Sequence, residues 1–352
     1  MEIFEKINQI YMCLMDDDSK YIFEKRLLYS LTGNSSYIDE IICKKFYLHM
    51  KEQFKRMSFD DNSIVAQMCK ILRDKRIIIY GAGGYGLLYL ALLESCIIRA
   101  DVIGYYDKYK KGDFFGLERI DIQDFDEDVN WLITQKDILL KNEIEGELKD
   151  LGIKESKILR FDSVDLMDFT GIYFPNFLSF KNEVFVDGGC YDGKSSMDLI
   201  KICKDYKKIY AFEPDKENIK LINKKFASEN IEILPYGLWD EKMELHFSSG
   251  GQGSRIDESG EETISVDSID NCVDDCVTYI KMDIEGSELK ALLGAKEIIQ
   301  KYQPKLAISI YHKKEDIIDI PLTILKLNSR YKFFLRHYSP GTYDTVLYAT
   351  VE

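Results

Sequence analysis

Residues 184–196 read Val-Phe-Val-Asp-Gly-Gly-Cys-Tyr-Asp-Gly-Lys-Ser-Ser. A short apolar run that ends in an acid and clustered glycines predicts a buried parallel strand, a tight turn and the start of a helix. Glycines in such a turn let a ligand approach the backbone closely. A second apolar run, Ile209 to Phe212, ends on Glu213. The pattern predicts two strands of a parallel α/β sheet, each with an acid at the carboxyl end, where ligands bind in such folds.

The two acids indicate the kind of ligand. Glu213 is placed to accept hydrogen bonds from both hydroxyls of a ribose, and Asp187 can face a cationic amino group. This pair of carboxylates suits a nucleoside that bears an ammonium and a sulfonium, and the layout is that of an S-adenosylmethionine site. The alternative interpretation is an ordinary buried strand-turn-helix connection.

Length and composition limit the function classes. The 352 residues predict two or three domains, and 45% hydrophobic with 31% charged residues describe a soluble globular protein. A net charge of −14 argues against nucleic acid and anionic lipid as partners. Residues 1–18 match neither a signal peptide nor a membrane span, so we expect a cytoplasmic protein without membrane insertion. The sequence makes no prediction of the oligomeric state.

Eight cysteines are scattered through the chain without the paired spacing of a zinc knuckle. They are interpreted as reduced core thiols. No metal site is predicted.

The chain divides into three segments. Residues 1–70 carry helical spacing, with a predicted cap at Asp16–Ser19 before the second helix and a turn at Gly33–Ser36. Residues 71–165 are predicted to form a small Rossmann-like domain. Residues 166–352 form the third segment.

A second glycine turn, Gly81–Gly86, follows the predicted strand Ile77–Tyr80. Its spacing fits the dinucleotide-binding fingerprint, and the next predicted strand ends on an acid that fits a ribose contact. The candidate residues are Gly81, Gly83, Gly86 and Asp107. Three interpretations stay open: a nicotinamide or nucleotide-sugar site, a site for a smaller ligand, and a structural turn. The short unit and the lysines beside the acid count against a ligand.

The third segment supplies a complete seven-stranded sheet. Strands are expected near 184–187, 208–213, 231–235, 278–283, 305–311, 331–337 and 344–350, the last two as an antiparallel hairpin around Ser339-Pro340-Gly341. An insertion follows the third strand. It holds Met243–Phe247 and then the loop Ser248–Arg255, which either folds over the substrate or is a disordered connector.

Residues 279–288 read Tyr-Ile-Lys-Met-Asp-Ile-Glu-Gly-Ser-Glu, which resembles the signature of the FkbM family of methyltransferases. Four further stretches match that family in order: Asp187–Gly189, Ala211–Pro214, Val266–Ile269 and Leu293–Ala295. The resemblance covers about half the chain. The helical segment followed by a glycine-turn domain also looks like an arrangement found in some members.

The resemblance implies a fold, a cofactor and a chemistry. The fold is α/β: a class I, Rossmann-like, seven-stranded methyltransferase domain preceded by a smaller Rossmann-like domain and an N-terminal helical segment. The chemistry is transfer from S-adenosylmethionine to a hydroxyl, or an amine, of a sugar, glycan or small metabolite, with surface or flagellar glycans as the leading guess. The matching positions predict these cofactor residues: Asp187, Gly189, Tyr191, Gly193, Glu213, Gly237, Leu238 and Asp240. Cys190 stands where alanine is common in the family, and Tyr191 makes the turn bulkier.

Catalytic candidates follow the fourth and fifth strands of the third segment. His312 should emerge at the carboxyl edge, and an ordinary histidine pKa suits proton acceptance near neutrality. We therefore predict His312 as the general base, the alternative being a partly buried strand-end histidine bonded to backbone. Asp283 and Glu285 orient the substrate or coordinate a divalent metal, although two carboxylates alone do not define a metal site. His337 and Arg255 are weaker candidates for substrate contact.

Three function classes remain open: a methyltransferase, a protein led by residues 71–165 that is either an NAD-dependent oxidoreductase or a nucleotide-sugar-binding protein, and a noncatalytic scaffold. An oxidoreductase of this kind needs a catalytic tyrosine-lysine pair at helical spacing, and no such pair follows the glycine turn in a credible place. A scaffold predicts eroded acids, yet Asp187, Glu213, Asp283 and Glu285 are all present. The methyltransferase is favoured.

Overall fold

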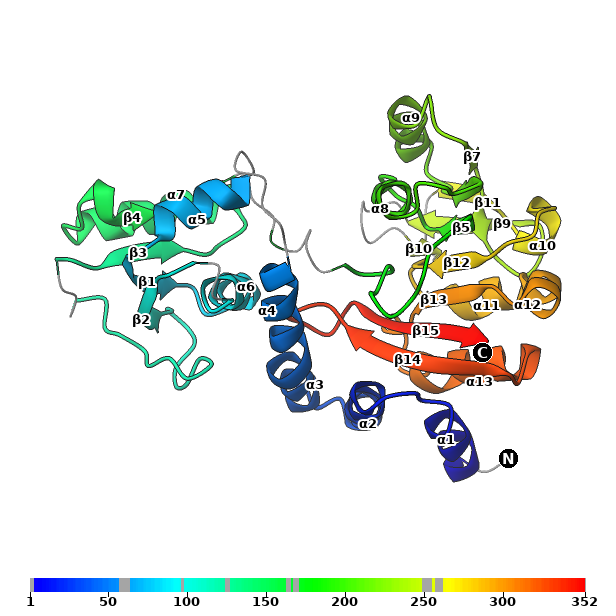
Figure 1. The fold of residues 1–352 in the computed structure, drawn as a ribbon, viewed down its shortest axis with the longest axis horizontal. Helices are drawn as coiled ribbons and strands as arrows, with labels where there is room; N and C mark the ends of the chain where they lie inside the picture. Colours follow the sequence, from blue (N-terminus) through cyan, green and yellow to red (C-terminus); the bar gives the residue numbers. More distant parts are fainter. Residues whose placement is uncertain are drawn as a thin grey trace. The chain divides into compact units, whose positions relative to one another are not determined.

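The computed structural model describes residues 3–56, 64–95, 98–123, 127–162, 166, 171–248, 255–256 and 262–351. The chain forms two compact units (Figure 1). Unit 1 comprises Met1–Tyr37, Ile172–His337 and Thr342–Glu352, and unit 2 comprises Ile38–Gly171 and Tyr338–Gly341.

Unit 1 is built on a seven-stranded sheet in the order β14-β15-β13-β12-β5-β6-β7. Its strands are β5 (Val184–Gly188), β6 (Lys208–Phe212), β7 (Ile231–Leu234), β12 (Tyr279–Met282), β13 (Lys305–Ser309), β14 (Tyr331–His337) and β15 (Thr345–Val351). All neighbours pair parallel except β15, which is antiparallel to both β13 and β14. Each of the seven expected strands is confirmed.

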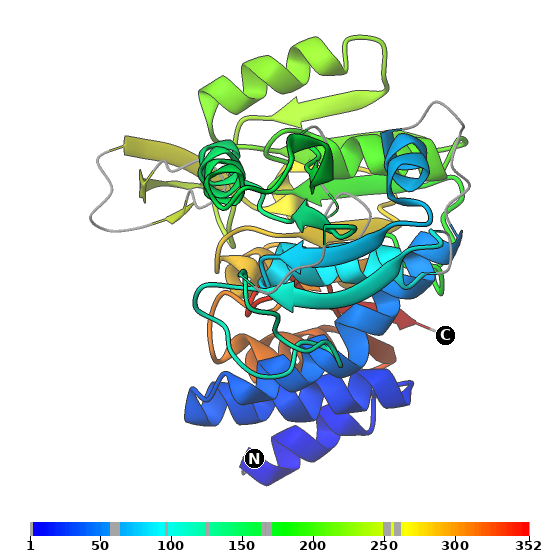
Figure 2. The same ribbon diagram turned by 90° about the vertical axis from the view of Figure 1, so that its left-hand side faces the viewer.

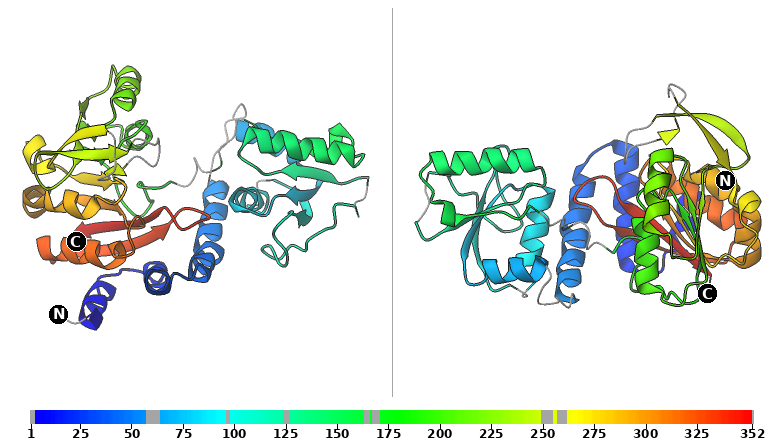
Figure 3. Two further views of the ribbon diagram at one scale, coloured as in Figure 1. Left: turned by 180° about the vertical axis from the view of Figure 1, so that it is seen from behind. Right: turned by 90° about the horizontal axis from the view of Figure 1, so that it is seen from above.

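The strand order reverses beside β5, because the chain first builds outward through β6 and β7 and then returns to add β12 on the other side. Right-handed crossovers therefore place the helices of the two halves on opposite faces, as Figure 3 shows. The helices are α8 (Lys194–Ile202) and α9 (Lys216–Lys225) on one face, and α11 (Glu288–Leu293), α12 (Lys296–Tyr302) and α13 (Asp316–Leu327) on the other. Ligands bind at such a reversal, outside the carboxyl ends of the strands.

The first two helices, α1 (Ile3–Tyr11) and α2 (Asp17–Thr32), belong to unit 1. Helix α2 packs along β14: the Leu335 backbone N–H donates to Ser19 Oγ over 2.9 Å, and Arg336 Nη2 lies 2.6 Å from Asp16 Oδ2. Asp16 caps the helix by accepting from the Ser19 N–H, and Gly33 ends it in the left-handed conformation, which confirms both predicted signals. The expected helical segment 1–70 is thus shared between the units.

A second, smaller sheet in unit 1 has the order β10-β9-β11-β8. Its strands are β8 (Gly237–Leu238), β9 (Met243–Ser248), β10 (Arg255–Ile256) and β11 (Glu262–Asp267), drawn in olive in Figure 2. The first part of the expected insertion forms strand β9. Its Leu245 packs against Ile264 and Val266, which are buried in β11. The short α10 (Ile269–Cys272) follows. Residues 249–254 of the predicted loop, and the Arg255 side chain, lie outside what the structure describes.

Unit 2 contains a four-stranded parallel sheet in the order β2-β1-β3-β4. Its strands are β1 (Arg76–Tyr80), β2 (Asp101–Tyr106), β3 (Asn130–Ile133) and β4 (Ile158–Leu159). Its helices are α4 (Tyr47–Arg56), α5 (Ile64–Leu72), α6 (Gly84–Leu93) and α7 (Ile138–Asp150); α3 (Ser36–Ile41) and a π-helical stretch, Ile42–Phe46, precede α4. The first three strands lie where strands were expected, whereas the two-residue β4 was not predicted.

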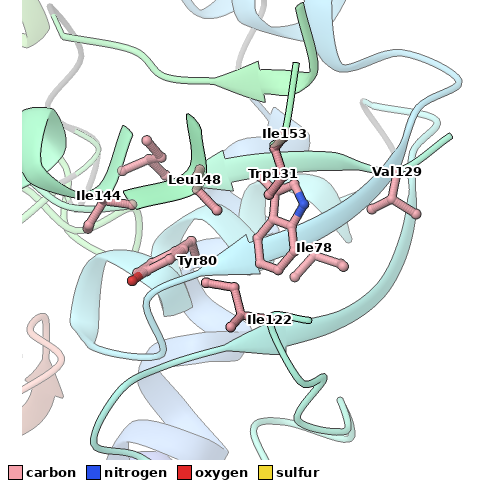
Figure 4. Close-up of a cluster of buried hydrophobic side chains, with 9 residues drawn as sticks. Ile78, Tyr80, Ile122, Val129, Trp131, Ile144, Leu148 and Ile153 are labelled. Carbon is pink, nitrogen blue, oxygen red and sulfur yellow. The ribbon is translucent and has the colours of Figure 1, made fainter. Parts of the chain in front are cut away.

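Trp131 on β3 lies at the centre of the core that joins this sheet to α7 (Figure 4). Ile78 and Tyr80 alternate along β1 onto the same face, and Ile144 and Leu148 of α7 cover them. Burial of large side chains contributes about 1.5–3 kcal/mol each, so these residues stabilise unit 2 with a core of its own.

The seven cysteines in the described residues are all free, and Cys96 lies outside them. Cys43 and Cys276 are exposed, so the expectation of core thiols does not hold for those two. Within the described residues, every helix falls short of the length and apolar character that a membrane span needs.

Candidate functional site

Asp187 lies at the end of β5 and is completely buried. Its Oδ2 accepts hydrogen bonds from the hydroxyls of Ser195 and Ser196, both over 2.6 Å. Lys281 Nζ lies 3.2 Å from Oδ1. The carboxylate at the first strand end is therefore held by an ammonium of the protein itself, together with two hydroxyls from the start of α8.

Lys281 stands opposite Asp187 in the register of β12 and β5. Its ammonium donates to the carbonyls of Gly188 over 3.0 Å and Gly189 over 2.7 Å. Burial lowers the pKa of Lys281, but Asp187 and Asp283 outweigh burial and raise the pKa above its usual value. Sequence reasoning missed this residue, although a lysine inside an otherwise apolar central strand is itself a signal, because lysine is rarely buried unless paired.

The turn after β5 needs glycine at two positions. Gly189 has a φ of +71°, and a Cβ there would lie 2.1 Å from the Asp283 carbonyl oxygen. Gly193 has a φ of +76°, and its Cβ would lie 2.4 Å from the Phe226 ring. L-residues avoid this conformation and real side chains do not fit these spaces. The turn therefore packs tightly between the ends of β12 and α9.

Glu213 follows β6 and is 6% exposed. Its Oε2 accepts from the Tyr191 N–H over 2.9 Å, which ties the acid to the glycine turn, and its Oε1 accepts from the Asp215 N–H over 3.0 Å. Burial raises the pKa of Glu213 despite these donors. The charged form is thus held at some cost beside the turn.

The three residues predicted on the adenine side lie beyond β7. Gly237 and Leu238 form β8, and the Leu238 side chain packs close to the Gly188 backbone. Asp240 Oδ2 lies 2.7 Å from Lys290 Nζ. Leu238 is therefore next to the turn, whereas Asp240 faces a lysine of α11.

A second polar cluster lies at the ends of β12 and β13. Asp283 Oδ2 accepts from the Tyr173 hydroxyl over 2.6 Å, and Oδ1 accepts from the Tyr311 hydroxyl over 3.1 Å. Burial favours the neutral acid, but Lys281 and His312 outweigh it and hold the pKa of Asp283 below its usual value. No sequence signal points to Tyr173, which comes from a segment far from the motifs.

His312 lies among three acids. Its Nδ1 is 2.9 Å from Glu288 Oε1, and its Nε2 is 3.5 Å from Asp283 Oδ1 and 3.6 Å from Glu285 Oε2. Burial lowers the pKa of His312, but the bond to Glu288 and the charges of Asp283 and Glu285 raise it to about 9. The expected ordinary pKa is therefore wrong, because the sequence does not reveal that Glu288 turns back onto the ring.

The backbone after β12 adopts an unusual conformation. Glu285 has a φ of +54° and Gly286 a φ of +92°. A non-glycine residue in this region costs of order 1–3 kcal/mol, and such strain clusters at functional sites. Here it accompanies the approach of the Glu285 carboxylate to His312.

The glycine turn of unit 2 is closed on itself. Asp107 Oδ2 accepts from the Ala82 N–H, and Oδ1 accepts from the N–H groups of Tyr109 and Lys110, each over 2.8 Å. A Cβ on Gly86 would lie 2.0 Å from the Gly81 carbonyl oxygen, whereas Gly83 faces open space. Tight packing of α6 onto the turn accounts for Gly86 without a ligand.

His337 is buried, with Nδ1 2.8 Å from Thr345 Oγ1 across the β14–β15 hairpin. The structure therefore places this weaker candidate for substrate contact within the hairpin.

Residues 187–331 match the family described as the methyltransferase FkbM domain. This matched segment is similar to the FkbM methyltransferase domain and makes up fewer than half of the chain's 352 residues. The match runs from the acid at the end of β5 to the start of β14, so it includes Asp187, Asp283 and His312 but not Tyr173. The resemblance seen in the motifs is confirmed for this segment, and the match supports a methyltransferase. Among curated proteins the comparison finds no match.

Several solved structures resemble the chain. The methyltransferase FkbM from Methylobacillus flagellatus is 23% identical, with 91% of this chain and 100% of that chain covered and a TM-score of 0.47. An rRNA methylase from Streptococcus thermophilus is 16% identical, covering 49% and 89%, with a TM-score of 0.32. Fibrillarin from Aeropyrum pernix, with natively bound S-adenosyl-L-methionine, is 11% identical, covering 52% and 71%, with a TM-score of 0.33.

Proposed function

We propose that the FkbM domain transfers a methyl group from S-adenosylmethionine, bound at the β5–α8 turn, to a hydroxyl of an acceptor bound beside His312. The observation that carries this proposal is the contact between the residues around Asp187 at the end of β5 and those around Asp283 at the ends of β12 and β13. Lys281 pairs with Asp187 on one side and precedes Asp283 by two residues of the same strand. The Gly189 backbone also packs directly against the Asp283 carbonyl. A cofactor on the turn would thus lie next to the acids and the histidine.

The proposed cofactor contacts keep the residues expected from the sequence. Glu213 would accept from the ribose hydroxyls through lone pairs that its backbone donors leave free, since a carboxylate accepts about four hydrogen bonds. The turn from Gly189 to Gly193 would carry the methionine end, and Leu238 would face the adenine. Asp187 is completely buried, so it would act on the cofactor ammonium through its charge and not by direct contact.

The proposed acceptor side contains His312, Asp283 and Glu285. An imidazole with a pKa of about 9 carries a proton at neutral pH, so it orients the acceptor oxygen first and accepts a proton only after losing its own. Methyl transfer is an in-line displacement in which positioning supplies most of the rate, about 7–11 kcal/mol of barrier in well-oriented systems. We propose these three side chains as the positioning and proton-transfer groups.

The acceptor class rests on the family resemblance. We propose a sugar, glycan or small-metabolite hydroxyl, with an amine as the alternative, in a cytoplasmic enzyme of surface or flagellar glycan modification. The net charge of −14 disfavours a nucleic-acid acceptor. We do not extend the proposal to a nucleotide ligand in unit 2, because Asp107 is taken up by three backbone donors.

The test is calorimetric titration of the full chain with S-adenosylmethionine, S-adenosylhomocysteine and NAD. We expect saturable binding of both sulfur nucleosides. At a hundred times its dissociation constant, a ligand bound only by the folded protein adds about 2.7 kcal/mol of stability, so melting temperature gives an independent readout. Binding of NAD alone would contradict the proposal and favour the oxidoreductase.

A further inference from the structure

A histidine and three acids converge where β12 and β13 end. Asp283, Glu288 and His312 each offer a ligand atom, and these atoms all lie within 4.8 Å of one another. Glu285 adds a fourth group, with Oε2 3.6 Å from His312 Nε2. The His312 side chain is 8% exposed and that of Glu288 is 1% exposed, whereas those of Asp283 and Glu285 are 24% and 32% exposed, so the cluster is buried on one side and reachable on the other.

The two edges of the imidazole ring differ. Nδ1 is held by Glu288 Oε1, which also accepts from the Ile284 N–H over 2.9 Å, so this edge is fixed. Both ring nitrogens are buried: Nδ1 lies close to Glu288 Oε1 without the geometry of a good hydrogen bond, and Nε2 has no hydrogen-bond partner. The nearest carboxylate oxygens, on Asp283 and Glu285, are at 3.5 and 3.6 Å, which is long for a hydrogen bond. In metal sites a ligating histidine donates its other ring N–H to a carboxylate.

We propose that a divalent cation binds between His312 Nε2, Asp283 and Glu285, with Glu288 holding the ring from behind. Ligand atoms about 2.0–2.2 Å from one ion lie roughly 3.0–3.6 Å from each other, and the nitrogen lies 3.5 and 3.6 Å from the two oxygens. The hydroxyls of Tyr173 and Tyr311 bind the Asp283 carboxylate and fix its orientation. Such outer partners are a regular feature of metal sites.

Charge and donor type indicate the kind of cation. Three carboxylates face one imidazole, and Lys281 is committed to Asp187 and two backbone carbonyls. A dication would balance this excess of negative charge. One nitrogen and two carboxylates suit Mn²⁺ or Zn²⁺ better than Ca²⁺, which takes six to eight oxygens. A bound cation would replace the proton on His312 Nε2, and the ion instead of the imidazole would then orient the acceptor oxygen. That role rests on the proposed methyl transfer, whereas the binding of the ion does not.

The experiment uses the full chain, stripped of metal with EDTA and free of cofactor and acceptor. MnCl₂ is titrated while electron paramagnetic resonance measures the free ion, and ZnCl₂ is titrated by calorimetry. We expect one saturable site per chain. Glu285→Gln and His312→Gln should each weaken binding at least tenfold, and Glu288→Gln about 10–100-fold through the lost support of the ring.

The matched control is Glu217→Gln, an exposed acid of α9 whose partner is Lys220. It should bind the ion like the wild type. Glu285 is the most exposed of the proposed ligands, so its variant is the least expected to disturb folding. The affinity of each variant for S-adenosylmethionine checks that the variant is folded. The proposal is overturned by absence of saturable binding of both ions, or by binding that persists unchanged in folded Glu285→Gln. Loss of cofactor binding with retained Mn²⁺ binding would instead count against the proposed methyl transfer alone.

Discussion

The two units contain the same local pattern, a glycine turn after one strand and an acid at the end of the next strand, yet the two acids behave in opposite ways. In both units the acid accepts a backbone N–H from the turn: Ala82 donates to Asp107, and Tyr191 donates to Glu213. Three backbone donors outweigh burial at Asp107 and lower its pKa. At Glu213 burial outweighs the donors and raises the pKa.

This difference separates a structural acid from a candidate binding acid. Asp107 stabilises its own turn when charged, so the fold alone explains it. Ionisation of Glu213 lowers the stability of the folded state, and groups with such shifted pKa values cluster at functional sites. Unit 1 also brings Asp283 and His312 to the same edge through β12 and β13. The third strand of unit 2 brings Thr134, whose hydroxyl donates to the Tyr80 and Gly81 carbonyls and closes the turn further.

The largest expected effect is on turnover. His312→Asn should lower turnover about 10²-fold, the usual size of a proton-transfer contribution, with S-adenosylmethionine affinity nearly unchanged. Asp107→Asn, in the turn of unit 2, should leave turnover as in the wild type. Single-turnover kinetics with the true acceptor make the measurement. If folded His312→Asn keeps more than about a third of the wild-type rate, the catalytic assignment fails.

Cofactor affinity should show the next largest effect. Glu213→Ala removes a charged partner of the ribose, and hydrogen bonds to charged groups contribute about 1.5–3 kcal/mol, so affinity should fall at least tenfold. Asp107→Ala is the matched change in unit 2 and should leave this affinity unchanged. Calorimetry measures the S-adenosylmethionine affinity of both variants. Equal affinities would mean that Glu213 is no more a cofactor-binding acid than Asp107.

Much of the fold could be predicted because hydrophobic periodicity and glycine turns are local. All seven strands of the main sheet were expected, and so was the Asp16 cap. The small sheet was missed because β9 pairs with β11 across a long sequence separation, and its Leu245 is only partly buried. The two-residue β4 carries too little pattern for detection.

The site was only partly predictable for a different reason. Residues at strand ends, such as Glu213 and Asp283, follow from pattern, but their partners come from segments that the sequence does not bring together. Tyr173 reaches Asp283 from before β5, and Glu288 folds back onto His312. The pKa of His312 therefore differs from the expected value because it depends on these tertiary contacts.

Glycine substitutions should separate packing from open space in unit 2. Gly86→Ala places a Cβ 2.0 Å from the Gly81 carbonyl oxygen, and overpacking of this kind costs about 1–3 kcal/mol. Gly83→Ala meets nothing within 4 Å and should cost less than about 1 kcal/mol as a cap change. Amide hydrogen exchange of β1 and α6 in the full chain measures both. Equal protection in the two variants would mean that the close approach at Gly86 is not needed.

The smallest effects concern pH and test the opposite pKa directions of the two acids. The pKa of Asp107 is lowered, so its contribution to stability is present above the unfolded value near 4 and is lost as pH falls through the folded pKa. The pKa of Glu213 is raised, so its contribution is present below the unfolded value of about 4.3 and is lost as pH rises through the folded pKa. Relative to Asp107→Asn, the wild type should lose stability in unit 2 below about pH 4. Relative to Glu213→Gln, the wild type should gain stability in unit 1 as pH falls from neutrality towards about 4. Hydrogen exchange as a function of pH measures the stability of the two units separately. If the wild type changes in stability in the same direction in both units as pH falls, relative to Asp107→Asn and Glu213→Gln, then the two acids do not have pKa values shifted in opposite directions.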